Sequence, residues 1–78
     1  MPPIKQRELY QKLKALGFNG PVPGGKHPYF EHPNFDFPLT VPNPHRGDLD
    51  VTMQKQILKR LNSDFGFTLS NDDWLKLS

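Results

Sequence analysis

The stretch KHPYFEHPNFDFPLTV, residues 26–41, decides the fold of this chain. Apolar residues occupy alternate positions in both of its halves, which is the spacing of β-strands with one buried face. We therefore predict one strand over residues 26–32 and a second over residues 35–41, joined by a hairpin connection at His32-Pro33-Asn34. The side chains expected on the open face of the first strand are His27, Tyr29 and Glu31. The core-facing side chains expected from the second strand are Phe35, Phe37, Leu39 and Val41.

Two amphipathic helices are predicted outside this stretch. Leu9, Leu13 and Leu16 share one face of a helix over residues 5–16, and Gly17 ends that helix. A second helix over residues 52–61 has an apolar stripe and a basic face, with Asp50 or Thr52 as its N-cap. The stripe comprises Met53, Ile57, Leu58 and Leu61, and the basic face comprises Lys55, Gln56, Lys59 and Arg60.

The remaining segments are short or irregular. Residues 19–25 are rich in Gly and Pro, so at most a short, irregular edge strand is expected there. Residues 42–50 read as a polar loop. A short last helix is expected to begin at Ser70, where Asp73 can complete a capping box.

This order of elements predicts a single α+β domain over residues 1–78. A three-stranded antiparallel sheet with both main helices on one face, followed by a short C-terminal helix, would bury all the apolar stripes. The opposite face of the sheet, which carries His27 and Tyr29, would stay open to solvent.

Composition excludes several classes of protein. The 78 residues include no cysteine, which rules out disulfides and thiolate metal sites. No apolar run approaches the roughly 20 residues that cross a bilayer, and the N-terminus lacks the apolar core of a signal peptide. We therefore expect a cytoplasmic protein. The spacing of His27, His32 and His45 matches no common zinc pattern, and no nucleotide-binding fingerprint is present, so neither a metal nor a cofactor is expected.

The charge distribution favours a polyanionic partner. Residues 1–60 carry nine Lys or Arg and five Asp or Glu, a net charge of +4, whereas residues 61–78 carry one Lys and three Asp, a net charge of −2. A basic body of this kind suits RNA. The alternative is an ordinary solvated surface.

His27 is the candidate catalytic residue. It follows Gly24-Gly25-Lys26 at the start of the first predicted strand, and a histidine can accept or give a proton near neutral pH. RNA carries its own nucleophile, the 2′-hydroxyl, so cleavage needs only proton transfer and a cation near the phosphate. The alternative is that His27 merely occupies the start of a strand. The residues expected to bind RNA are Lys26, Tyr29, Arg46, Lys55 and Lys59.

Three segments together resemble the HicA (YcfA-like) family of mRNA interferase toxins. These are Leu9–Phe18, the Gly25-Lys26-His27-Pro28-Tyr29-Phe30 element, and the run from Thr40-Val41-Pro42 to Ile57-Leu58-Lys59. The acidic segment at residues 70–75 is similar to the C-terminal end of that family. The chain departs from the family's pattern at Lys26, where a small Ser is usual, and at Pro28, where a second histidine is frequent.

The resemblance implies an α-β-β-β-α fold like that of double-stranded-RNA-binding domains. It also implies metal-independent endonuclease action on mRNA, an antitoxin of the HicB type that covers the active site, and a catalytic role for His27. Two other functions stay open on the residues alone. One is a non-catalytic RNA-binding module, and the other is a protein-interaction domain that uses the same surface.

Overall fold

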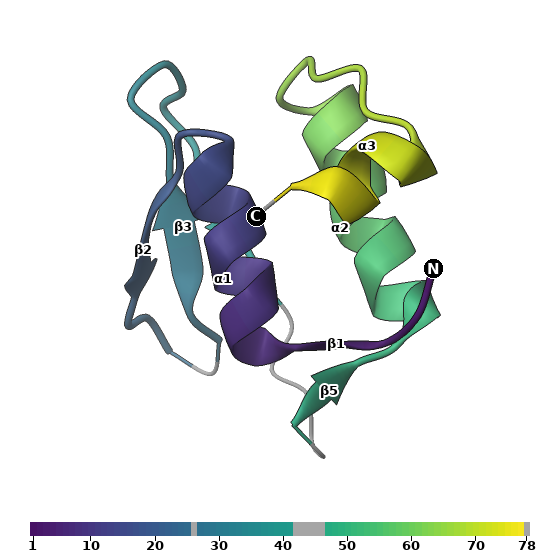
Figure 1. The fold of residues 1–78 in the computed structure, drawn as a ribbon. Coiled ribbons are helices and arrows are strands. Elements are labelled where there is room, and N and C mark those ends of the chain that lie inside the picture. Colours follow the sequence, from purple (N-terminus) through teal and green to yellow (C-terminus); the bar gives the residue numbers. More distant parts are fainter. Residues whose placement is uncertain (26, 42–46, 78) are drawn as a thin grey trace.

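The computed structural model describes residues 1–25, 27–41 and 47–77 and has an α+β architecture (Figure 1). The elements along the chain are β1 (Ile4–Lys5), α1 (Gln6–Ala15), β2 (Asn19–Val22), β3 (Tyr29–Glu31), β4 (Leu39–Thr40), β5 (Asp48–Leu49), α2 (Val51–Ser63) and α3 (Asn71–Lys76). Strands β2, β3 and β4 form an antiparallel three-stranded sheet with β3 in the middle. The expected fold class, with helices flanking this sheet and a short C-terminal helix, is confirmed.

One face of the sheet carries the core. Phe30 of β3 and Leu39 of β4 are neighbours in the sheet and are fully buried. They pack with the apolar stripes of α1 and α2, so Leu9 and Leu13 share a core with Ile57, Leu58 and Leu61. Figure 1 shows α1 in front of the sheet and α2 alongside α1. Because the core takes one face of β3, its alternate residues must face the other way.

Both helix starts in the second half of the chain have side-chain caps. The Met53 backbone N–H donates to Asp50 Oδ1 at 2.8 Å, which identifies Asp50 rather than Thr52 as the N-cap of α2. Ser70 and Asp73 form the reciprocal capping box expected for α3. These bonds satisfy backbone donors that would otherwise have no partner at a helix start.

The second predicted strand is shorter than expected. Strand β4 covers only Leu39–Thr40, and the connection from β3 spans residues 32–38 rather than a tight turn at 32–34. Phe37 was expected in the core but is 41 % exposed. The reason is an aromatic cluster: the rings of Phe35 and Phe37 pack against Phe65, just after α2, at centroid distances of 5.0 and 4.8 Å.

A second, two-stranded sheet was not predicted. Strand β1 pairs with β5, so that the buried Ile4 lies opposite the buried Leu49. The segment 42–50 was expected to be a polar loop throughout, but its last part contributes β5. Residues 42–46 of that segment lie outside the described part of the chain. The pair brings the N-terminus next to the start of α2 (Figure 1).

Two buried polar side chains hold α3 in place. The Lys12 ammonium donates to the backbone oxygens of Trp74, Leu75 and Leu77 at 2.8, 3.4 and 3.0 Å, at the negative end of α3. Burial lowers the pKa of Lys12 from its ordinary value. Gln54 accepts a hydrogen bond from Trp74 Nε1 at 2.9 Å. No helix among the described residues is long and apolar enough to span a bilayer.

Candidate functional site

His27 lies two residues before β3, in the connection from β2. Its side chain is exposed, and the neighbouring Phe30 faces the core. No residue in the described part of the chain makes a hydrogen bond or an ion pair with the His27 ring. None of these residues therefore blocks either ring nitrogen. A ring nitrogen that can reach a bound molecule is what proton transfer to that molecule requires.

The turn that carries His27 packs against Tyr29. Gly25 adopts the left-handed conformation, with φ of +57°, which glycine takes without steric cost. Gly24 lies against the Tyr29 ring so closely that a Cβ at Gly24 would be 2.6 Å from Tyr29 Cε1. A side chain at position 24 would therefore require the Tyr29 ring to shift.

His32, in contrast, has both ring nitrogens engaged. Its Nε2 is 3.2 Å from the Leu16 oxygen, and its Nδ1 accepts a hydrogen bond from the Asn34 backbone N–H at 3.2 Å. This arrangement requires the neutral ring with its proton on Nε2. The ring also packs edge-on against Phe18, at a centroid distance of 5.0 Å. His32 therefore has a structural role in shaping the β3–β4 connection.

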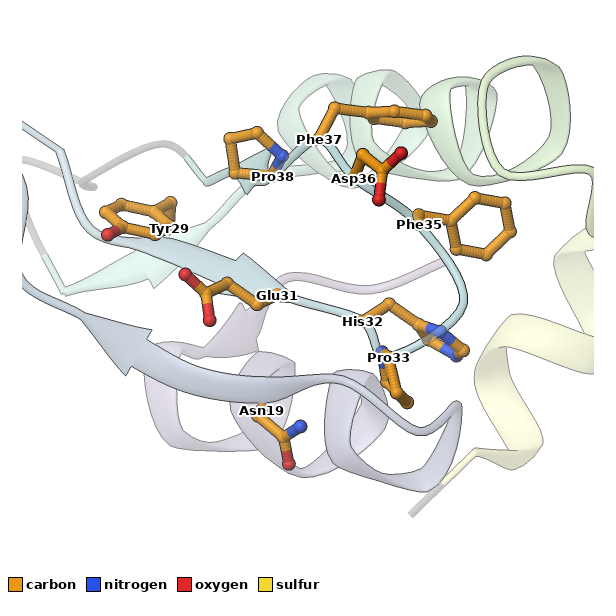
Figure 2. Close-up of a pocket in the computed structure, with 9 residues that line it drawn as sticks. All are labelled: Asn19, Tyr29, Glu31, His32, Pro33, Phe35, Asp36, Phe37 and Pro38. Atoms are coloured by element: carbon orange, nitrogen blue, oxygen red, sulfur yellow. The ribbon is translucent and has the colours of Figure 1, made fainter.

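An open cavity of about 400 Å³ adjoins Tyr29 and Glu31, which alternate in β3 with the buried Phe30 (Figure 2). Strands β2 and β3 and the connection from β3 to β4 form its walls. The residues that line it are Asn19, Tyr29, Glu31, His32, Pro33, Phe35, Asp36, Phe37 and Pro38. Sequence reasoning placed Glu31 on the open face but did not anticipate a cavity, because its far wall depends on how residues 32–38 fold.

Two of the other expected RNA-binding residues, Lys55 and Lys59, lie on α2 and away from β3. Lys55 and Lys59 are exposed, one turn apart on α2, and Figure 1 places α2 on the right of the molecule and the β2–β3 turn on the left. Lys26 and Arg46 lie outside the described residues. Neither Lys55 nor Lys59 forms an ion pair with a described residue, whereas Arg60 pairs with Asp64 at 3.1 Å.

No cluster of three or more His, Asp or Glu side chains that could hold a metal ion occurs within residues 1–25, 27–41 and 47–77. The described side chains that can do chemistry near the turn are thus an imidazole and a phenol. Together they offer proton transfer and a ring on which a nucleobase can stack.

Comparison with known proteins identifies a family. The model of the family described as HicA toxin of bacterial toxin-antitoxin matches residues 7–62. The matched segment runs from α1 to nearly the end of α2 and includes His27 and Tyr29, whereas α3 lies beyond it. No curated protein matches the chain. No solved structure matches it either.

Proposed function

The chain belongs to the HicA toxin family of bacterial toxin–antitoxin systems, and from this premise we propose that it cleaves mRNA, with His27 as its proton-transfer group. Membership of this family implies an antitoxin as partner. We take that antitoxin to be of the HicB type and the site of action to be the cytoplasm, where mRNA is translated. Residues 1–78 act as a single HicA-like domain in this proposal, since one core joins side chains from Ile4 to Trp74.

The chemistry needs no metal ion in this proposal. A base removes the proton of the 2′-hydroxyl, the freed oxygen attacks the adjacent phosphorus, and the bond from phosphorus to the 5′-oxygen breaks. The leaving 5′-oxygen takes up a proton from an acid. The products carry a 2′,3′-cyclic phosphate and a 5′-hydroxyl. His27 carries out one of these two proton transfers. Tyr29 stacks on a nucleobase next to the scissile phosphate and so holds the RNA in place.

The observation that carries this proposal is the contrast between the two described histidines. The His32 ring uses both nitrogens to hold Leu16 and Asn34, so it has no nitrogen left for substrate. The His27 ring is exposed, two residues before Tyr29 in the chain, and has no partner among the described residues. It also lies inside the segment that matches the toxin family.

The test compares His27→Ala with the unaltered protein on a long mRNA, with EDTA present. We expect the variant to cut at least about 100-fold more slowly, the lower range for loss of a proton-transfer group. Its unfolding free energy should change by about 0.5 kcal/mol or less, because the side chain is exposed. The new RNA ends should be cyclic phosphates, and an RNA with 2′-deoxy sugars should survive.

A matched control guards against a copurifying ribonuclease. Gln11→Ala changes an exposed residue of α1 and should cut as fast as the unaltered protein after identical purification. If His27→Ala also cuts at that rate, His27 is not the proton-transfer group. If all three proteins bind RNA and none cuts it, a non-catalytic RNA-binding role replaces the proposed one.

A further inference from the structure

The cavity beside Tyr29 is acidic in an otherwise basic chain. Glu31 and Asp36 line it, and none of its lining residues is Lys or Arg. No described residue forms an ion pair with either carboxylate. His32 adds no positive charge in the neutral form that its two hydrogen bonds require. Two carboxylates without a described partner, at the mouth of one cavity, favour a cationic ligand and disfavour phosphate.

Aromatic rings form much of the remaining wall. Figure 2 shows Glu31 and Asp36 between the Tyr29 ring at one end and the Phe35 ring at the other, with Phe37 above. A planar guanidinium can stack on an aromatic ring while it donates paired hydrogen bonds to a carboxylate. An ammonium group has no flat face with which to stack. The combination of rings and carboxylates therefore suits arginine better than lysine.

Contacts within the chain hold the walls of the cavity in place. Both ring nitrogens of His32 fix the start of the β3–β4 connection, and the ring of Phe37 packs on Phe65 at 4.8 Å. A connection held in this way keeps Asp36 opposite β3. A rigid site loses less entropy on binding than one that must fold around its ligand.

From these observations we propose that the cavity is a docking site for an arginine side chain of a partner protein. The identification of that protein as the antitoxin rests on the proposed function. Arginine is enriched among the residues that anchor protein interfaces, and a cavity of about 400 Å³ has room for a guanidinium group together with water. RNA does not suit the cavity, because its phosphates would lie beside two carboxylates.

The experiment is an NMR titration of the full ¹⁵N-labelled chain. The probe is the peptide acetyl-Gly-Gly-Arg-Gly-Gly-amide, and the matched probe carries citrulline, which has nearly the same shape as arginine but no charge. We expect the arginine peptide to shift the backbone amides of Glu31 and Asp36 saturably, and the citrulline peptide to leave them unchanged. Binding should weaken as salt is raised, because exposed charges are screened.

Variants assign the binding to the two carboxylates. The double change Glu31→Gln with Asp36→Asn should lower the affinity for the arginine peptide by about fivefold or more, as expected for the loss of two exposed ion pairs. Both positions are exposed, so the fold should persist, which the amide spectrum reports directly. Asp72→Asn, which removes one exposed carboxylate of α3, should leave the affinity unchanged.

Several results would overturn the proposal. These are the absence of saturable shifts, equal binding of the citrulline peptide, and unchanged affinity in the double variant. An uncleavable 2′-O-methyl RNA serves as a third probe. If it shifts the same amides and its affinity falls in the double variant, the cavity belongs to RNA. Since the titration measures no cleavage, an inactive chain that binds the arginine peptide would refute the proposed function alone.

Discussion

Replacing Gln54 with methionine should remove much of the stability of this protein. Gln54 is fully buried in α2 and makes three hydrogen bonds. Its Nε2 donates to the backbone oxygens of Pro2 and Leu49 at 2.8 and 3.2 Å, and its Oε1 accepts from Trp74 Nε1 at 2.9 Å. Methionine has a similar length and volume but cannot replace these bonds, so the change tests hydrogen bonding with little effect on packing.

The magnitude follows from the groups that lose their partner. Trp74 and Leu49 are fully buried, so the Trp74 N–H and the Leu49 carbonyl would both lose the hydrogen bond from Gln54 with no access to water, whereas Pro2 is exposed and can hydrate. An unsatisfied buried group costs about 1–3 kcal/mol, so the variant should lose about 2–6 kcal/mol. A chain of 78 residues has roughly 4–12 kcal/mol in total. Gln54→Met should therefore lose roughly half of its unfolding free energy.

Urea unfolding followed by tryptophan fluorescence measures this loss, since Trp74 is the single tryptophan in the sequence. Gln56→Met is the matched control: it makes the same change two residues further along α2 at an exposed position, and it should change stability by about 0.5 kcal/mol or less. An unfolding free energy of Gln54→Met within 0.5 kcal/mol of the unaltered protein would refute the reasoning.

Three further changes test other parts of the molecule. Gly24→Ala places a methyl group 2.6 Å from Tyr29 Cε1, so the ring signals of Tyr29 should shift in NMR spectra and RNA cleavage should slow by about 10- to 100-fold. In a Tyr29→Ala background the same change should have no added effect on cleavage. Unshifted ring signals would contradict the contact. Lys12→Met should lower the free energy of unfolding, measured by urea titration, by about 1–2 kcal/mol and should speed amide hydrogen exchange in α3. Unchanged exchange would mean that α3 does not need the Lys12 ammonium. Lys55→Glu with Lys59→Glu should weaken RNA binding and lower the slope of log affinity against log salt by roughly 1.4 for a single strand, whereas an unchanged slope removes α2 from the RNA surface.

The helices and their caps were predictable because their signals are local. Leu9 and Leu13 mark the buried face of α1 within two turns, and the Ser70–Asp73 box lies within four residues. The same holds for β3, where alternation alone placed Phe30 in the core and Glu31 on the exposed face. In these segments the sequence pattern and the tertiary structure agree.

The errors arise where distant residues decide the structure. Phe35 and Phe37 alternate as strand residues do, but Phe65, some thirty positions later, draws both rings into an aromatic cluster. The β1–β5 pair has only two residues in each strand, which is too short for any periodic pattern. Gln54 was not singled out, since its burial becomes favourable only once Trp74 and Leu49 supply partners.

The candidate site also has a part that local sequence pattern predicted and a part that depends on distant residues. Alternation along residues 26–32 correctly predicted that Tyr29 and Glu31 do not share the core with Phe30. The cavity did not, because its far wall is the β3–β4 connection, whose course depends on the aromatic cluster around Phe65. Glu31 was placed on the open face, but nothing in the sequence indicated that Asp36 would lie across from it.

The open face of β3 has two ends that differ in chemistry, and Tyr29 lies between them. His27 precedes the strand at one end, while Glu31 and the cavity lie at the other. Tyr29 and Glu31 are roughly 7 Å apart along the strand, which is within a Debye length at physiological salt, so the carboxylate acts on any phosphate beside the ring. RNA should therefore cross the face at the His27 end and reach no further than Tyr29. A protein anchored by arginine in the cavity would approach from the acidic end and cover the same ring. Such a partner would stop cleavage by occupying Tyr29, without having to touch His27 itself.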